Sequence, residues 1–202
     1  MRSLILDNYD SFTYNLFDYV QRFCTESDCV EVRRNDEISI DEALAFDNII
    51  LSPGPGLPSE SGIMPELLSN PKSQMPILGI CLGHQAIAES HGAALSKLKN
   101  PLHGYEGTTT IINPNNALLI GVDKTIKTGH YHSWVVSNMN FPKELSIDAI
   151  GENEEIMAIT HQRLPRFGIQ FHPESIMTSF GLTIILNWIT FCRNHKKRQI
   201  IP

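Results

Sequence analysis

The feature that most constrains the fold is an alternation of short apolar segments with helical patterns in the first half of the chain. The strand-like segments are residues 3–9, 29–35, 48–56 and 75–81, and the helix-like segments are residues 12–23, 39–46, 62–70 and 82–92. This β-α-β-α-β-α-β order predicts right-handed crossovers and a mostly parallel sheet with helices on both faces. We therefore expect an α/β fold.

The second half of the chain has a different character from about Thr108 onward. Short strand-like segments follow one another without a convincing helix between them, at residues 108–112, 117–122, 128–137, 145–151, 155–162 and 166–172. The sheet is expected to continue there with antiparallel or mixed strands. Residues 178–192 restore a helical period and predict a closing helix. We expect one domain over residues 1–192, followed by a solvated basic tail over residues 193–202.

Composition excludes several classes of function. A net charge of −6 and an isoelectric point near 5.7 give no basic surface for nucleic acid. The first apolar run meets Asp7 at once, and the longest apolar segment is too short to cross a bilayer, so we expect a cytoplasmic protein with no membrane span. The four cysteines have no zinc-like spacing, and we expect neither a metal site nor a disulfide framework.

Cys81 stands in the sequence Gly79-Ile80-Cys81-Leu82-Gly83, where a predicted strand meets a predicted helix. A nucleophile at the apex of a sharp strand-to-helix turn needs small neighbours, because side chains there would crowd the backbone. The free N–H groups at the helix start favour a thiolate, and the N–H of Leu82 is suited to stabilise an oxyanion. The alternative is an ordinary buried cysteine.

His172-Pro173-Glu174 is the candidate base for this nucleophile. Proline disfavours helix at the preceding residue, so we expect an extended backbone that projects His172 and Glu174 to the same side. The carboxylate would hold one imidazole nitrogen while the other faces the thiol. The alternative is a surface loop that carries these residues by chance.

A third segment, residues 51–62, has three prolines and three glycines directly after a predicted strand. Gly54 and Gly56 would allow a small substrate to approach the main chain and would offer a second N–H to an oxyanion. A stiff connecting loop without a catalytic role is the alternative.

Together these segments resemble the class I (triad) glutamine amidotransferases. The closest likeness, carried by "LDNYDSFTYNL", "ILSPGPGLP", "PILGICLGHQAI", "HYHSW" and "GIQFHPESIMT", is to the glutaminase subunits of anthranilate and aminodeoxychorismate synthases. The resemblance implies a flavodoxin-like open twisted sheet. It implies that Cys81 is the nucleophile, His172 the general acid and base, and Glu174 the residue that orients it. The implied glutamine-binding residues, with Leu82, are Gly54, Pro55, Gly56, Gln85, Ser133 and Trp134.

The resemblance also implies partners. The substrate would be L-glutamine, no cofactor is expected in this subunit, and the ammonia would pass to a separate large subunit that binds and aminates chorismate. The chain departs from the family pattern at Tyr105, where His-Gly-Lys is usual, and at His130, where arginine is common. We expect both residues on the rim of the site, where they would affect coupling to the partner and leave the glutaminase chemistry intact.

Three alternatives remain open at this point. The partner could be the aminodeoxychorismate enzyme, or one subunit could serve both. The chain could be a noncatalytic regulatory subunit on the same fold, although such proteins usually lose the nucleophile or the base. An independent thiol hydrolase or peptidase would leave Gln85, Ser133 and Trp134 unexplained.

Overall fold

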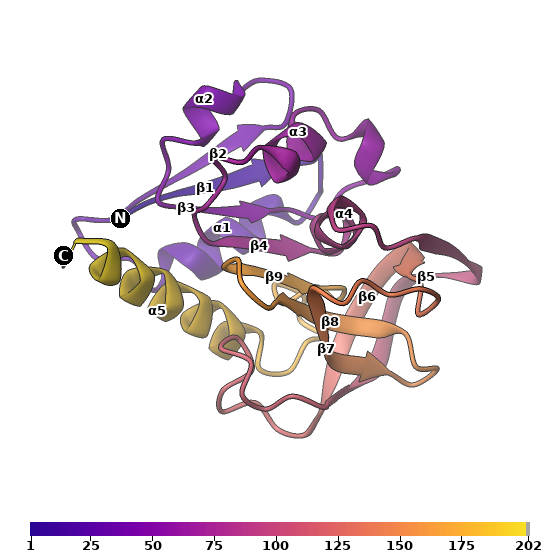
Figure 1. Cartoon of the computed structure of the whole chain (residues 1–202). Coiled ribbons are helices and arrows are strands. Elements are labelled where there is room, and N and C mark those ends of the chain that lie inside the picture. Colours follow the sequence, from indigo (N-terminus) through magenta and orange to yellow (C-terminus); the bar gives the residue numbers. More distant parts are fainter. Residues whose placement is uncertain (201–202) are drawn as a thin grey trace.

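A computed structural model describes the backbone of residues 1–200 and the side chains of residues 1–198 (Figure 1). Its first half alternates strands and helices as the sequence predicts. The elements are β1 (Arg2–Asp7), α1 (Thr13–Gln21), β2 (Cys29–Arg34), α2 (Ile40–Ala43), β3 (Asn48–Leu51), a 3-10 helix (Pro58–Glu60), α3 (Met64–Ser69), β4 (Ile77–Ile80) and α4 (Leu82–Ser90).

The second half is built of antiparallel strands and one long helix. Its elements are β5 (Leu95–Ile111), β6 (Thr125–Val136), β7 (Leu145–Gly151), β8 (Ile156–His161), β9 (Arg166–Ile169) and α5 (Gly181–Ile200). Residues 117–122, expected as a strand, instead form turns. Leu118 and Leu119 are buried there, and the carbonyls of Leu118 and Ile120 accept hydrogen bonds from Asn187 of α5.

All nine strands lie in one sheet, in the order β2-β1-β3-β4-β9-β8-β7-β5-β6. The first five strands in this order are parallel, and the pairs from β9 to β6 are antiparallel. The parallel part has the order of a flavodoxin-like sheet, in which ligands bind beyond the carboxyl ends of the strands. The predicted fold class is therefore confirmed.

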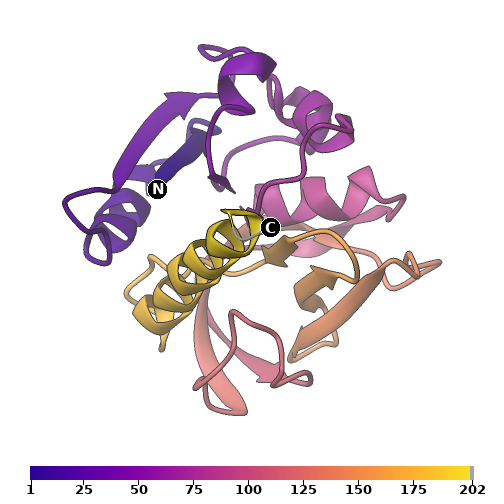
Figure 2. The same ribbon diagram turned by 60° about the vertical axis from the view of Figure 1, so that its left-hand side comes forward.

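Helices cover both faces of the parallel part of the sheet, as Figures 1 and 2 show. Alternate residues of one strand face opposite cores. Ile5 of β1 packs in the core with α1 and α5, whereas its neighbours Leu4 and Leu6 pack in the core with α2, α3 and α4. Trp188 of α5 is fully buried.

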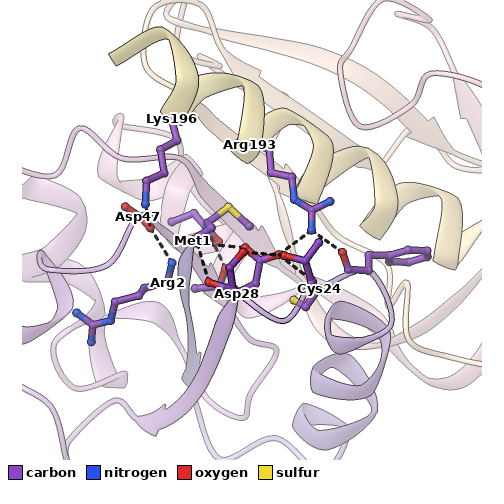
Figure 3. Close-up of polar contacts among 12 residues, drawn as sticks. Met1, Arg2, Cys24, Asp28, Asp47, Arg193 and Lys196 are labelled. Carbon is purple, nitrogen blue, oxygen red and sulfur yellow. Dashed lines mark hydrogen bonds and ion pairs between the residues drawn. The ribbon is translucent and has the colours of Figure 1, made fainter. Parts of the chain in front are cut away.

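The basic C-terminal segment is not a separate solvated tail over the described residues. Helix α5 continues through the expected boundary after Cys192. Arg193 donates to the Phe23 carbonyl at 2.6 Å and to Asp28 at 2.8 Å, and Lys196 pairs with Asp47 at 2.6 Å. Figure 3 shows Arg193 and Lys196 extending from the helix toward Asp28 and Asp47. Phe23, Asp28 and Asp47 are far from this segment in the sequence, so its basic composition alone predicts a solvated tail. Residues 201–202 of the expected tail lie outside the described part.

Candidate active site

Cys81 occupies the turn between β4 and α4, beyond the carboxyl end of the strand. Its backbone has φ +52° and ψ −100°, a conformation that non-glycine residues rarely adopt and that is typical of strained functional sites. The turn is fixed on both sides, because Cys81 N–H donates to the Ile169 carbonyl at 2.8 Å and the Cys81 carbonyl accepts from Gln85 N–H at 3.0 Å. The thiol is thus held at the N-terminus of α4.

The flanking glycines allow the first turn of α4 to lie directly against β3 and β4. A Cβ at Gly79 would lie 2.3 Å from the carbonyl carbon and oxygen of Gly83, and a Cβ at Gly83 would lie 2.5 Å from the Leu51 carbonyl oxygen. Both contacts are with backbone, which cannot rotate away. The expectation that larger residues would crowd this turn is confirmed, and this is why the thiol lies between glycines.

His172 and Glu174 are in direct contact. The Nδ1 atom of His172 lies 2.7 Å from Oε1 of Glu174, and both side chains are buried. The expected extended backbone is wrong for Glu174: the chain turns after His172, and the Ser175 N–H donates to the His172 carbonyl at 3.3 Å. The turn brings the carboxylate to the imidazole by a different path from the one expected.

The imidazole of His172 is oriented by its surroundings. Its ring packs edge-on against Tyr131 and Phe12, with centroids at 4.9 Å and 6.1 Å. Burial alone would lower the pKa of His172, but the Cys81 sulfur and the Glu174 carboxylate raise it well above its usual value. The Nε2 atom is buried, with no partner other than that sulfur among the described residues. The ring therefore lies between the thiol and the carboxylate that orients it.

A cavity of about 180 Å³ opens beside the thiol. This volume is below that of pockets for drug-sized ligands and suits a molecule of amino-acid size. The structure brings Cys81 and every predicted glutamine-binding residue to its wall; the lining residues are Gly54, Pro55, Gly56, Cys81, Leu82, Gln85, Tyr131, His132, Ser133 and Trp134. His172 and Glu174 do not line this cavity.

The loop after β3 approaches the elbow closely. A Cβ at Gly54 would lie 2.4 Å from the Asn8 carbonyl oxygen and 3.0 Å from a Leu82 methyl group, and Gly56 has φ +76°. The side chain of Asn8 donates to the Ser52 carbonyl at 2.9 Å and so ties this loop to the end of β1. Leu82 opens α4, so its N–H is one of the four that a helix leaves without an intrahelical acceptor. Leu82 and the Gly54–Gly56 loop, the two proposed sources of oxyanion N–H groups, both line the cavity.

One polar residue beside the thiol, Gln170, is absent from the sequence-based candidates. It is fully buried, and its Nε2 atom lies 3.6 Å from the Cys81 sulfur. A signal was present in the sequence, because Gln170 precedes His172 by two residues, and residues at this spacing in an extended segment share a side.

The expected rim position is wrong for His130. Its side chain is buried, and it bonds to Thr128 at 2.9 Å and to His132 at 3.1 Å. Burial lowers the pKa of His130 to about 4 and, assisted by the neighbouring His130, that of His132 to about 3. Tyr105 pairs with His130 across β5 and β6 but is exposed, and its hydroxyl contacts Glu152 at 3.3 Å. Of the two positions that depart from the family pattern, Tyr105 is accessible to a partner and His130 is not.

The described residues contain no group of three histidine, cysteine, aspartate or glutamate side chains placed to hold a metal ion. In the same part of the chain, no helix combines the length and the apolar character needed to span a membrane.

Comparisons with known proteins identify the family of this chain. Residues 4–191 match the family described as glutamine amidotransferase class-I. The chain is 41% identical to the aminodeoxychorismate/anthranilate synthase component 2 of Bacillus subtilis, over 92% of this chain and 94% of that protein. It is also 41% identical to the bifunctional protein TrpGD of Thermotoga maritima, over 93% of this chain but only 32% of that longer protein.

A solved structure shares the fold. A crystal structure from Thermoplasma acidophilum, described as that of a GMP synthase subunit, superposes with a TM-score of 0.85 at 26% identity, covering 98% of this chain and 97% of that one. The family match spans nearly the whole chain and includes the elbow, the glycine loop and the His172 turn. The chain therefore belongs to the class I glutamine amidotransferases.

Proposed function

We propose that this chain hydrolyses the side-chain amide of L-glutamine and delivers the ammonia to a separate, chorismate-binding synthase subunit. The observation that carries the proposal is that the Cys81 elbow and the glycine loop line one cavity of amino-acid size, while the thiol at its wall also contacts the buried His172–Glu174 pair. The names of relatives that align along nearly their whole length support the chorismate-aminating partner.

The reaction follows from the positions of the groups. The Cys81 thiolate attacks the amide carbon, and N–H groups of Leu82 and of the Gly54–Gly56 loop stabilise the oxyanion. His172 donates a proton to the departing nitrogen, so ammonia leaves and a glutamyl thioester remains. His172 then takes a proton from water, which attacks the thioester and releases glutamate and the thiol. Only the thiol, the imidazole, the carboxylate and backbone N–H groups take part, and we propose that this subunit uses no cofactor.

The partner determines the pathway. Anthranilate synthase, with a role in tryptophan biosynthesis, is the main proposal, and the B. subtilis relative, named for both enzymes, keeps aminodeoxychorismate synthase as the second candidate. Titrating this chain against each large subunit with chorismate and glutamine, and identifying the aminated product, separates the two. A noncatalytic regulatory role would require that neither mixture hydrolyses glutamine. The cytoplasmic location remains a prediction.

Replacing the nucleophile tests the glutaminase assignment. Cys81→Ala should abolish glutamine-dependent product while the reconstituted complex still uses free ammonium, because the two half-reactions occupy separate sites. Cys29→Ala is the matched control: Cys29 is exposed at the amino end of the edge strand β2, whereas Cys81 follows the carboxyl end of β4 within the sheet, and the loss of Cys29 should leave both reactions unchanged. Glutamine-dependent product from the Cys81→Ala complex would refute the assignment.

A further inference from the structure

Gln170 contacts the reactive sulfur from within the protein. It follows β9 directly, its side chain is fully buried, and it does not line the cavity assigned to glutamine. Its Nε2 atom lies 3.6 Å from Sγ of Cys81, within the range of an N–H···S hydrogen bond. Such a bond is weak to a neutral thiol and stronger to a thiolate, because the acceptor is then charged.

The orientation of this amide follows from a backbone carbonyl. The carbonyl of Trp134 can only accept hydrogen bonds, so Gln85, whose Nε2 lies 2.8 Å from it, must present its NH₂ group there. The same NH₂ group lies 3.1 Å from Oε1 of Gln170 and donates its second hydrogen to it. With its oxygen directed to Gln85, Gln170 must direct its NH₂ group to the sulfur of Cys81. The opposite rotamer would place two donors against each other.

His132 is a second hydrogen-bond donor to the Trp134 carbonyl. Nδ1 of His132 lies 3.1 Å from the Trp134 carbonyl oxygen and must carry the hydrogen. Nε2 of His132 therefore accepts, and it does so from Nδ1 of His130 at 3.1 Å. Since burial lowers the pKa of both rings far below neutrality, these neutral tautomers persist at pH 7.

We propose that Gln170 is a catalytic residue: its side-chain N–H donates to the Cys81 thiolate and stabilises the nucleophile. His172 provides the proton transfers. The amide of Gln170 does not ionise, and its NH₂ group stays directed at the sulfur during both half-reactions. Because Gln170 lies outside the glutamine cavity, its loss should lower kcat and leave KM for glutamine nearly unchanged. The inference rests on the proposed role of Cys81, but its test does not require glutamine or a partner.

The experiment measures how fast iodoacetamide alkylates Cys81 as a function of pH, by peptide-resolved mass spectrometry. The thiolate displaces iodide and forms a thioether, so the rate follows the fraction of thiolate. Gln170→Glu keeps the shape but places a negative charge beside the sulfur, and the midpoint of the profile should move up by about 1 pH unit or more. Gln170→Met removes the donor and should move the midpoint in the same direction by less. The exposed Cys29 is the reference in each sample.

Gln162→Glu is the matched control, since Gln162 is an exposed glutamine that donates to the Lys143 carbonyl far from the thiol. Its profile should match that of the parent. If a Gln170 variant fails to fold, Gln85→Met provides the second variant: it removes the tether that directs the Gln170 amide and should move the midpoint upward as well. Folded Gln170 variants with the parental midpoint, or an equal shift in Gln162→Glu, would overturn the proposal. The outcome is independent of whether the chain turns over glutamine.

Discussion

Replacing Gly79 by alanine should disable the elbow by steric displacement alone. The added Cβ would lie 2.3 Å from the Gly83 carbonyl and 2.6 Å from the His84 nitrogen, both in the first turn of α4. Ordinary contact begins near 3.4 Å, so this turn, which carries the Leu82 N–H, must retreat from β4 by about 1 Å. Overpacking of this kind costs about 2 kcal/mol of stability. A 1 Å misplacement of catalytic groups costs on the order of 100-fold in rate.

The assay pairs glutamine hydrolysis with urea unfolding of the same preparations. Gly92→Ala is the control, because Gly92 has φ +92° and no atom within 4 Å of a built Cβ. That variant should lose about 1 kcal/mol through backbone strain, yet keep its turnover. Parental turnover in Gly79→Ala, or an equal loss of turnover in Gly92→Ala, would refute the argument that close packing at the elbow sets the rate.

Three further predictions concern the base, the buried histidines and the C-terminal helix. His172→Ala should approach the complete loss of Cys81→Ala, whereas Glu174→Gln should retain measurable hydrolysis because the carboxylate only orients the ring; equal, complete losses would contradict these roles. The free energy of unfolding should fall as pH drops from 6.5 to about 4, because unfolded His130 binds a proton that the folded ring rejects, an effect of about 3 kcal/mol. If urea titrations give the same free energy of unfolding at pH 6.5 and at about pH 4, the lowered pKa of His130 is wrong. Arg193→Ala should lower stability by about 1 kcal/mol at unchanged turnover, and thermal unfolding identical to the parent would mean that this end of α5 is not docked.

Local sequence was sufficient for the parallel half of the fold and for the elbow. The strand that ends at Ile80 and the contact of Gly79 with Gly83 involve near neighbours, so a short stretch of sequence is enough to predict them. The contact of Gly83 with Leu51 of β3 is not visible in such a stretch. The His172–Glu174 contact was also predicted, because the two residues are adjacent to one proline. The path of the backbone between them was wrong, since a turn and an extended segment can both bring these side chains together.

Features that depend on distant partners could not be predicted in the same way. The burial of His130 follows from its contacts with Thr128 and His132 inside the sheet, whereas a motif position carries no information on depth. Similarly, Arg193 donates to Asp28 and to the carbonyl of Phe23, and both residues are near the N-terminal end of the sequence. Basic residues at a chain end are compatible with both a helix C-terminus and a solvated tail.

The turn that carries the base also protects an edge of the sheet. Strand β6 is the last strand in the sheet order, and unpaired backbone groups on such a strand can recruit another chain. At Gly129 these groups are occupied, because the carbonyl accepts from the His172 N–H at 3.1 Å and the N–H donates to the Thr178 hydroxyl at 2.9 Å. Substitutions that loosen the turn between His172 and Thr178 should therefore promote aggregation as well as slow turnover, and loss of solubility would accompany loss of activity at this one segment.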